Sequence, residues 1–493
     1  MAQTQLIILI VMVAYMAVII GYGFFIGRKV KNSSDFAIAG RKLPGWAAAL
    51  SERATGESGW ALLGLPGAAY ATGLTEMWTA FGCALGIILG WIFIALRFRN
   101  EAEKYQADSF MDYLGRRHGA TGKYIRTFGS LIIAFFFFFY IGAQFIGGGK
   151  ALYQILDIDI YIGLIIIFIF VVPYTIYGGF QSVVYTDVIQ AVIMLVTLIV
   201  APIVGLIYIA NNPEVYATSI GSALQQAGSN YTSLTGAAKG LGAGIVIAGG
   251  FSWMFGYLGG MPQLAVRFMA IENHKQAVQA RNIAVSWTVF AYTGALLLGW
   301  IGLAIFGPQS SALLDREAIM PAVLFKIFHP VIAAILITGV FAAIVSTANS
   351  LLILSATELS DNILIPTKWF KNSGIKKLTL SRIVTTVLAL AAFTFAITMK
   401  ENLIYNIVKY VWAGIGDTFS VVIILTLYWK KFHSRAALAT IIGGILFTIV
   451  WLQTGMEKQV SCLVMTFVFS LLTAVVTTFI FPPDAHTSEI TKD

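Results

Sequence analysis

The sequence contains few charged residues and very few cysteines. Only 11% of its 493 residues are charged, whereas 58% are hydrophobic, and the mean hydropathy is +0.82. A soluble chain of this length needs more charge on its surface, so this composition excludes a soluble globular protein. The two cysteines, Cys83 and Cys462, both lie in apolar segments, where we expect small buried side chains without redox chemistry.

Motifs of enzyme chemistry are also lacking. The sequence has no paired spacing of metal ligands, no phosphate-binding loop and no nucleophile elbow in a strand–turn–helix context. All five histidines fall in expected loops or in the tail, which argues against a histidine proton relay. The net charge of +9 comes from basic residues in short loops, a pattern of membrane topology and not of nucleic-acid binding. We therefore expect neither an enzyme nor a partner of nucleic acids.

Apolar segments of membrane-spanning length are abundant. About 20 apolar residues in a helix are enough to cross the hydrocarbon core of a bilayer. The first segment lacks a cleavage site of small residues and precedes a basic loop, so we interpret it as a retained helix and not as a signal peptide. The pattern predicts an all-α polytopic membrane protein with thirteen transmembrane helices, over residues 5–27, 45–70, 76–98, 125–150, 159–178, 186–209, 239–265, 282–306, 330–358, 382–399, 403–429, 437–455 and 460–482.

The loops between these segments alternate in their content of Lys and Arg. The loops after odd-numbered segments, with the tail, hold 24 of the 32 basic residues. Their counterparts on the other side hold seven, and Arg53 within the second segment completes the 32. Because basic loops stay in the cytoplasm, we expect the amino terminus outside and the carboxyl terminus in the cytoplasm. No soluble domain is visible, so a single transmembrane domain accounts for residues 1–493.

Two of the segments contain helix breakers. The second holds Glu52, Arg53 and Glu57 among glycines and a proline, and the seventh holds eight glycines within 240–262. Each backbone group left unpaired in hydrocarbon costs several kcal/mol, on the order of 2–7, so a broken helix lines a cavity or binds a ligand.

The two breaks stand five segments apart, which predicts an inverted repeat of five plus five helices with the site at the breaks. The repeats would span 45–209 and 239–429. Residues 1–44 would then add an amino-terminal helix and loop, and residues 437–482 two further helices.

Acidic residues within the segments are candidates for function because their burial is costly. Glu57 follows Arg53 by four residues, so an ion pair that holds the irregular backbone and a functional role both fit. Asp187 is expected near the start of the sixth segment, where helix capping is the alternative to function. Asp417 follows two glycines deep in an apolar segment, where a kink is possible.

A polar stripe marks the ninth segment. Ser346, Asn349 and Ser350 stand at helical spacings on one face, with Thr347 adjacent. Hydroxyl oxygens of this kind suit a hard monovalent cation, with carbonyls of a broken helix as further ligands. The alternative is that these side chains bond to the backbone or to a neighbouring helix.

Several motifs together resemble the sodium/solute symporter family, and within it the sodium/proline symporter branch. The matching stretches are Ser58-Gly-Trp60, Gly64-Leu-Pro-Gly67, Tyr185-Thr-Asp-Val-Ile-Gln190, Arg267-Phe-Met-Ala270 and Ser346-Thr347. Their order and spacing agree over nearly the whole chain. The resemblance implies a leucine-transporter-type fold with broken second and seventh helices, and sodium-driven uptake of a small organic solute by alternating access.

The resemblance also implies two cation sites. The main sodium site of the family corresponds to the carbonyls of Ala54, Glu57 and Ala343 and the hydroxyls of Ser346 and Thr347. A second sodium site, found in some members, would correspond to Asp187, Ser346, Asn349 and Ser350. Here an asparagine stands where a hydroxyl is usual.

A substrate pocket is implied as well, and this chain departs from the proline pattern around it. The acid of the proline branch falls on Gly56, with Glu57 next to it, and the stretch 253–262 is one residue longer. Gln144 and Asp417 replace small apolar residues, and the added acid would favour a cationic substrate. The expected substrate-binding residues are Ser58, Tyr140, Gln144, Trp253, Tyr257, Pro262 and Asp417.

The leading expectation is a sodium-coupled symporter of the cell membrane that imports proline or another amino acid. Its partners would be Na+, a small-molecule substrate and the lipid bilayer, with no obligate protein partner, because five plus five helices can enclose a site in one protomer. An alternative is a proton-coupled transporter that uses Glu57 or Asp417. A third class is a sensor or channel that retains the fold without the coupled cycle.

Overall fold

The computed structural model describes all residues except 1–2, 309, 312, 314, 400–403 and 483–493, and it leaves out the side chains of Gln3, Thr4, Ala120 and Gln154. Lys400 and the basic residue of the tail, both counted for the topology, therefore lie outside the described residues. The described residues are helical, apart from turns, loops and one isolated bridge between Leu43 and Ile271.

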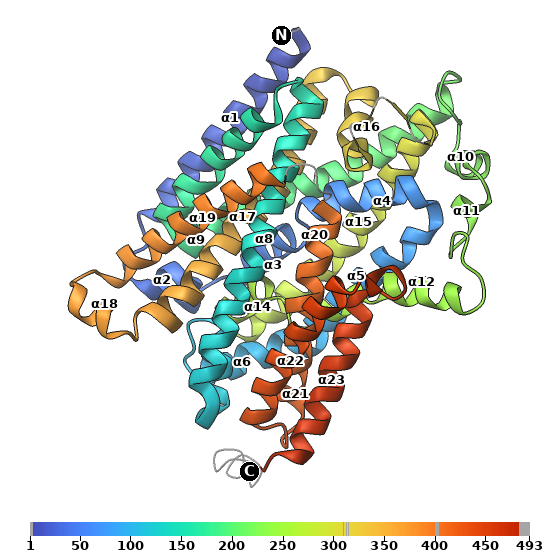
Figure 1. Cartoon of the computed structure of the whole chain (residues 1–493). Coiled ribbons are helices and arrows are strands. Elements are labelled where there is room, and N and C mark those ends of the chain that lie inside the picture. The colour runs from blue at the N-terminus through green and yellow to red at the C-terminus, as the bar shows by residue number, and fades with distance from the viewer. Residues whose placement is uncertain (1–2, 309, 312, 314, 400–403, 483–493) are drawn as a thin grey trace.

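The helices follow one another through the whole described chain (Figure 1). The first half contains α1 (Gln3–Gly27), α2 (Ser33–Ile38), α3 (Gly45–Gly56), α4 (Leu65–Thr72), α5 (Met77–Leu89), α6 (Leu96–Lys104), α7 (Phe110–Arg117), α8 (Gly122–Leu156), α9 (Ile160–Asn211), α10 (Ile220–Ala227) and α11 (Ser229–Thr232). The second half contains α12 (Leu241–Phe251), α13 (Trp253–Gly256), α14 (Pro262–Ala270), α15 (His274–Phe306), α16 (Ile319–Ile327), α17 (Pro330–Leu359), α18 (Lys368–Ser373), α19 (Lys377–Thr398), α20 (Ile404–Val411), α21 (Thr418–Tyr428), α22 (Ser434–Gln453) and α23 (Cys462–Ile480).

Ten helical stretches among the described residues are long and apolar enough to cross a membrane. Two of them, 60–104 and 160–211, each include parts of two segments that the sequence predicts separately, and the expected seventh segment contains the shorter apolar stretch 241–256. The number of thirteen crossings is therefore not confirmed. Exposed side chains on these helices are often large and apolar, for example Val18, Val387 and Phe479, as contact with lipid requires.

The break in the second expected segment is confirmed. α3 ends at Gly56, Ser58 is not helical, and the chain continues through the π-helical turn η2 (Trp60–Gly64) into α4. Pro66 is the second residue of α4, directly after η2, so its missing N–H lies where the π-helical turn passes into the α-helix. The glycines and the proline thus end one helix and begin the next within the membrane segment.

The seventh expected segment is interrupted twice. α12 ends at Phe251, the short helix α13 follows Ser252, and a turn leads to Pro262 at the start of α14. The turn includes Gly259 with a φ of 89°, a conformation that L side chains rarely adopt. Both breaks predicted from glycine and proline are therefore present.

α9 contains the two segments that the sequence predicts at 159–178 and 186–209. Gly179, whose φ of 57° and ψ of −159° are not helical, separates a helix that begins at Ile160 from a helix that ends at Asn211. The second helix follows Gly179 directly, so it begins before the expected residue 186. Asp187 lies in the interior of a helix and not in its first turn, so the capping interpretation of this residue is wrong.

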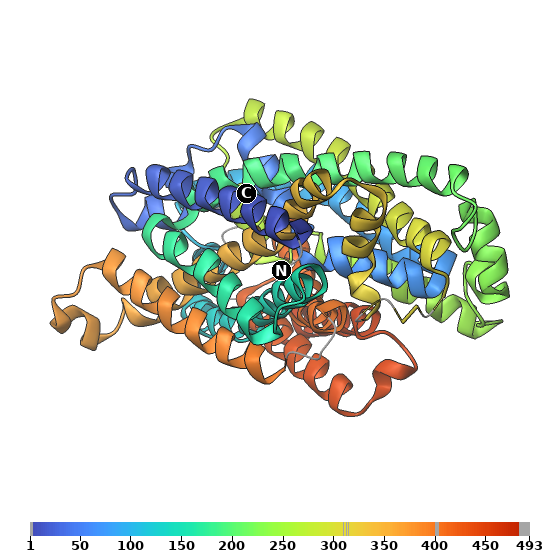
Figure 2. The same cartoon turned by 90° about the horizontal axis from the view of Figure 1, so that it is seen from above.

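The packing brings the two broken regions to the centre of the molecule. α17 packs against α9, α8 and α3, and α14 packs against α3. The segment with α18 and the segment with α10 and α11 lie at opposite sides in both views (Figures 1 and 2). This arrangement places the end of α3 beside the middle of α17 and α8, whereas α13 packs against α5 and η8.

Candidate functional site

The break after α3 changes the hydrogen bonds of its last carbonyls. The amide of Gly59 donates to the side chain of Gln144 at 3.1 Å, and the amide of Ala61 donates to the carbonyl of Ser58 at 3.1 Å. In an unbroken helix these amides would bond to the carbonyls of Thr55 and Glu57. The break therefore frees carbonyl oxygens at the end of α3, which are ligands that a hard cation prefers.

Hydroxyls of α17 lie beside these carbonyls. Thr347 donates to the carbonyl of Thr55 at 2.9 Å, and the Ser346 hydroxyl lies 3.3 Å from the Thr55 hydroxyl. Ser346, Thr347 and the expected carbonyl ligands Ala54 and Ala343 are all fully buried on these two elements. The donor set of hydroxyls and carbonyls fits a sodium ion, which is the cargo of the expected cycle.

A buried cluster of three charged groups surrounds the same break. Arg53 bonds to both carboxylate oxygens of Glu52 and, at 2.6 Å, to the first carboxylate oxygen of Glu57. The other oxygen of Glu57 accepts a hydrogen bond from the Tyr292 hydroxyl at 2.8 Å, and Trp91 donates to Glu52. The predicted ion pair between Arg53 and Glu57 is confirmed. The cluster is tolerated within the membrane because both carboxylates share Arg53 and also accept hydrogen bonds from Trp91 and Tyr292.

Asp187 belongs to a second cluster, on the opposite side of α3. Its Oδ2 accepts hydrogen bonds from Ser51 at 2.6 Å and from Arg267 at 3.0 Å. The Thr55 hydroxyl lies 3.4 Å from the same oxygen, and Ser350 accepts from Arg267 at 2.6 Å. Asp187 therefore joins α9 to α3 and α14, and Arg267 neutralises its charge.

The polar stripe of α17 is divided between two neighbours. The hydroxyls of Ser346 and Ser350 contact Thr55, at 3.3 and 3.0 Å. Asn349 instead turns to α9, where its amide donates to the Tyr174 hydroxyl and its oxygen accepts from Thr175 at 2.6 Å. Of the four residues expected at a second sodium site, Asn349 is thus held by other partners.

On the other side of the break, residues of α8 meet Ser58 and Gly59. The hydroxyls of Ser58 and Tyr140 lie 3.0 Å apart. Gln144, one turn further along α8, accepts a hydrogen bond from the Gly59 amide. All these side chains are fully buried. The structure thus brings together three of the residues expected in the substrate pocket.

Aromatic rings extend this group toward α13. Trp60 and Trp253 stack with ring centroids 4.6 Å apart, and Tyr257 contacts Trp412 at 4.3 Å. The ring centroids of Tyr405 and Trp253 lie 5.5 Å apart. Trp412 opens the π-helical turn η8 (Trp412–Asp417), a helix irregularity that often accompanies functional sites.

The remaining expected residues lie on α14 and η8. Pro262 begins α14 and is fully packed among other residues, and Gly260, just before it, approaches Gly416 and Ser420 closely. Asp417 is fully buried, and neither of its carboxylate oxygens has a hydrogen-bond partner among the described residues. Pro262 and Asp417 therefore lie on elements that approach each other at Gly260 and Gly416.

Three residues with clear contacts to these groups were not singled out from the sequence. Thr55 touches both α17 hydroxyls and Asp187, Tyr292 touches Glu57, and Trp412 touches Tyr257. Ser51 and Thr55 are one turn apart within the broken segment, a polar spacing that would have indicated Thr55. Tyr292 and Trp412 give no such signal, because aromatic residues are common throughout the membrane segments.

Comparisons with known proteins agree with this geometry. The sequence matches the family described as "Sodium:solute symporter family" over residues 36–444. The high-affinity proline transporter PutP of Bacillus subtilis (strain 168) is 33% identical over 453 residues, 91% of this chain and 93% of that protein. The sodium/proline symporter 2 of Staphylococcus saprophyticus is 32% identical, over 91% of this chain and 86% of that protein.

Solved structures share the fold. A Na+-coupled sialic acid symporter, in a substrate-bound outward-open state, superposes with a TM-score of 0.79 at 18% identity, over 97% of this chain and 98% of that one. MhsT in complex with L-phenylalanine has a TM-score of 0.55 at 12% identity, over 88% and 97%. The all-α, leucine-transporter-type fold expected from the sequence is confirmed. The chain therefore belongs to the sodium:solute symporter family, a family of multi-pass membrane transporters with sodium as the coupling ion.

Proposed function

We propose that this chain imports proline, or a closely related small amino acid, together with sodium. The observation that carries the proposal is the break after α3, where freed carbonyls face hydroxyls of α17 on one side and Ser58, Tyr140 and Gln144 on the other. Relatives that match more than 90% of this chain are named as proline transporters, which makes proline the first candidate.

The proposed main sodium site consists of the carbonyls of Ala54, Glu57 and Ala343 with the hydroxyls of Ser346 and Thr347. Sodium there would hold α3 against α17, and the same end of α3 carries Ser58, next to the proposed substrate. Sodium and substrate must therefore raise each other's affinity.

A second sodium site at Asp187, Ser346, Asn349 and Ser350 is a separate proposal. Arg267 already neutralises Asp187, and a second cation would add an unpaired positive charge to a buried cluster. We therefore expect one sodium ion per cycle, which the reversal potential of uptake measures directly. A ratio of two sodium ions per substrate molecule would support a second ion at these four residues.

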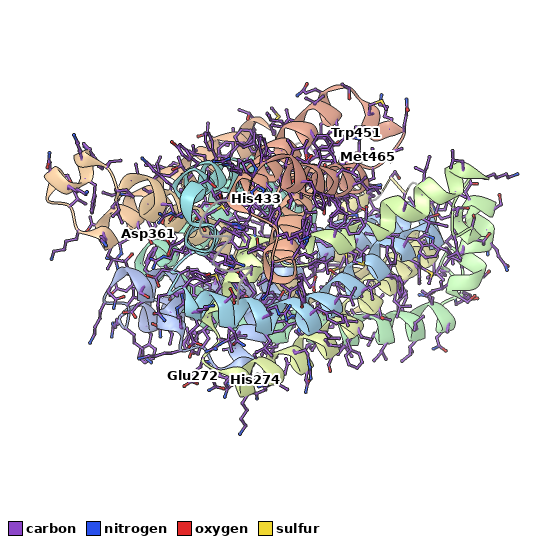
Figure 3. The ribbon with its side chains drawn as sticks, turned by 90° about the horizontal axis from the view of Figure 1, so that it is seen from below. Glu272, His274, Asp361, His433, Trp451 and Met465 are labelled. Atoms are coloured by element: carbon purple, nitrogen blue, oxygen red, sulfur yellow. The ribbon has the colours of Figure 1, made fainter. Side chains whose placement is uncertain are left out.

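The orientation in the cell membrane is also proposed. α1 begins at one end of the molecule and α23 ends at the other (Figure 1), as an odd number of crossings requires. Figure 3 views the end where α23 terminates, and Glu272 and His274 of an expected cytoplasmic loop lie together at its edge. The proposal places the amino terminus outside and this end in the cytoplasm. The repeats would span 45–209 and 239–429, with 1–44 and 437–482 as additions.

The test is uptake of labelled proline into proteoliposomes. An inward sodium gradient should drive accumulation, a matched potassium gradient should not, and unlabelled amino acids should compete in the order of their affinity. Accumulation that persists without sodium and collapses with the pH gradient would instead show proton coupling through Glu57 or Asp417. Currents far above carrier turnover would show a channel.

Asp417 supports a second candidate substrate class. Its buried carboxylate oxygens lack partners among the described residues, so a cationic solute would satisfy them. In that case cationic amino acids or amines should compete better than proline, and Asp417→Asn should abolish their advantage. An unchanged order of competitors in Asp417→Asn would exclude this role.

A further inference from the structure

The orientation of the Gln144 side-chain amide follows from its hydrogen bond with Gly59. The Gly59 amide, released by the helix break, is a donor only, so it must meet the carbonyl oxygen of the Gln144 side chain at 3.1 Å. The other end of this side chain is then its NH2 group. That nitrogen is buried and has no partner among the described residues.

A second donor lies near the first. The Trp412 indole nitrogen is buried close to the Tyr140 hydroxyl, and it makes no hydrogen bond of ordinary geometry with the described residues. Tyr140 is one turn before Gln144 on α8 and bonds to Ser58. Donors left unpaired in a dry site cost free energy, which a bound acceptor recovers. Gln144 of α8 and Trp412 of η8 therefore present N–H groups to the proposed substrate.

At the end of α13, the hydrogen bonds make Tyr257 an acceptor and not a donor. Arg53 forms an ion pair with one oxygen of Glu57, and a carboxylate in such a pair can only accept hydrogen bonds. Tyr292 must therefore give its single hydroxyl hydrogen to Glu57, at 2.8 Å. The Tyr257 hydroxyl lies 2.8 Å from that of Tyr292, so Tyr257 must donate to it. The oxygen of Tyr257 is then left with lone pairs only and can bind only a donor.

We propose that Gln144 and Trp412 bind the substrate carboxylate, whereas Glu57 and Tyr292 act as positioning residues that make Tyr257 an acceptor for the substrate N–H. The inference rests on the proposed import of an amino acid and deepens it, because it assigns an orientation to the zwitterion. Glu57 contributes through a chain of two hydroxyls and not as a proton carrier.

The first experiment exchanges the donor on α8. Gln144→Glu keeps the shape and an oxygen for the Gly59 amide, but it replaces the NH2 group with an oxygen. Affinities of proline and prolinamide are measured by thermal stabilisation in sodium, because prolinamide offers an N–H group where proline has a carboxylate. We expect the preference for proline to fall by about tenfold or more, since a hydrogen bond to a charged group is lost. An unchanged ratio would overturn the carboxylate assignment.

Gln144→Met protects this test against misfolding of the acidic variant. It removes both polar atoms at similar volume, so the proline preference should fall in the same direction. Equal losses for proline and prolinamide in both variants would show that Gln144 only holds the Gly59 amide, and would overturn the assignment.

The second experiment interrupts the hydroxyl chain. Tyr292→Phe leaves Tyr257 free to donate, so the site should accept an oxygen where it required an N–H. Proline is compared with tetrahydrofuran-2-carboxylate, in which oxygen replaces the ring nitrogen. We expect the preference for proline to fall by about tenfold, a change that lost packing alone would not produce. Equal weakening of both ligands would overturn the positioning role.

Tyr70→Phe is the matched control. It removes a buried hydroxyl that bonds to the carbonyl of Gly307, and it should leave both ratios unchanged. The outcomes are separable from the proposed function. Absence of sodium-driven uptake of any amino acid would refute the function, whereas intact uptake with unchanged ratios would refute only the orientation.

Discussion

At the scale of single residues, Thr55 links the parts of the proposed sodium site. Its carbonyl accepts from Thr347, and its hydroxyl contacts Ser346 and Ser350. A side chain with this many contacts is easily missed in a sequence, because a lone threonine in an apolar segment usually bonds to its own helix. The serine and threonine of α17 were predicted because they form a stripe.

The α17 hydroxyls should be required for coupling. Ser346→Ala with Thr347→Ala removes two cation ligands, and we expect the sodium dependence of uptake and of substrate binding to disappear. The protein should still insert, since the replaced side chains are small and buried against α3. Uptake against sodium concentration is the measurement, with insertion checked by yield in the membrane fraction. Unchanged sodium dependence in the double variant would contradict the site.

The buried ion pair of α3 should matter more than an exposed pair of the same spacing. Glu57→Ala removes one of the two carboxylates that pair with Arg53 and one of the two hydrogen-bond partners of the Tyr292 hydroxyl. We expect a loss of stability of about 1.5–3 kcal/mol, because a buried hydrogen bond to a charged group is lost. Arg99 and Glu103 have the same spacing, but the Glu103 side chain is 51% exposed. Glu103→Ala should cost about 0–1 kcal/mol. Thermal unfolding in detergent compares the two, and similar shifts would contradict the role of burial.

At the scale of helices, glycine and proline predicted both breaks correctly. Hydrocarbon allows an interrupted helix only where other groups pair its backbone, so breakers inside an apolar segment carry strong information. The boundary predicted between 159–178 and 186–209 is also present, because Gly179 has a non-helical backbone and breaks α9 there. The second helix follows Gly179 directly and so begins before the expected residue 186.

The contact between η8 and the turn that joins α13 to α14 depends on Gly260. A Cβ at this position would overlap with the carbonyl of Gly416 and the amide of Ser420, which are backbone atoms that cannot move away. Gly260→Ala should therefore separate the two elements and abolish substrate binding. Gly244→Ala on α12, where no atom lies within 4 Å of the added carbon, is the control and should bind normally. Binding is measured by thermal stabilisation with proline, and equal behaviour of the two variants would contradict the contact.

At the scale of the whole molecule, the orientation of the chain can be measured with cysteine labelling. Cys83 and Cys462 are buried, so the background is low. Asn230 and Asn372 are exposed, in the expected outer loop and in an expected cytoplasmic loop. We expect a membrane-impermeant maleimide to label Asn230→Cys in intact cells and Asn372→Cys only after permeabilisation. The reverse pattern would contradict the orientation proposed from loop charges.

Sodium should also stabilise the whole fold, because its proposed ligands join α3 to α17. At a concentration 100 times the dissociation constant, a bound ion adds about 2.7 kcal/mol to the free energy of unfolding. Thermal unfolding in sodium chloride against potassium chloride measures this effect. Equal unfolding temperatures in both salts would contradict a folded-state sodium site.

The sequence by itself determined the class of protein, the places of the two helix breaks and the family. These features depend on composition and on the order of residues along the chain, because hydrocarbon excludes charge and unpaired backbone. Only the tertiary structure decided which polar groups meet. Arg267 pairs with Asp187 across 80 positions, Tyr292 reaches Glu57 across 235, and Asn349 turns to α9 and not to α3. Such pairings arise from the packing of helices against one another, which a linear pattern of residue types does not contain.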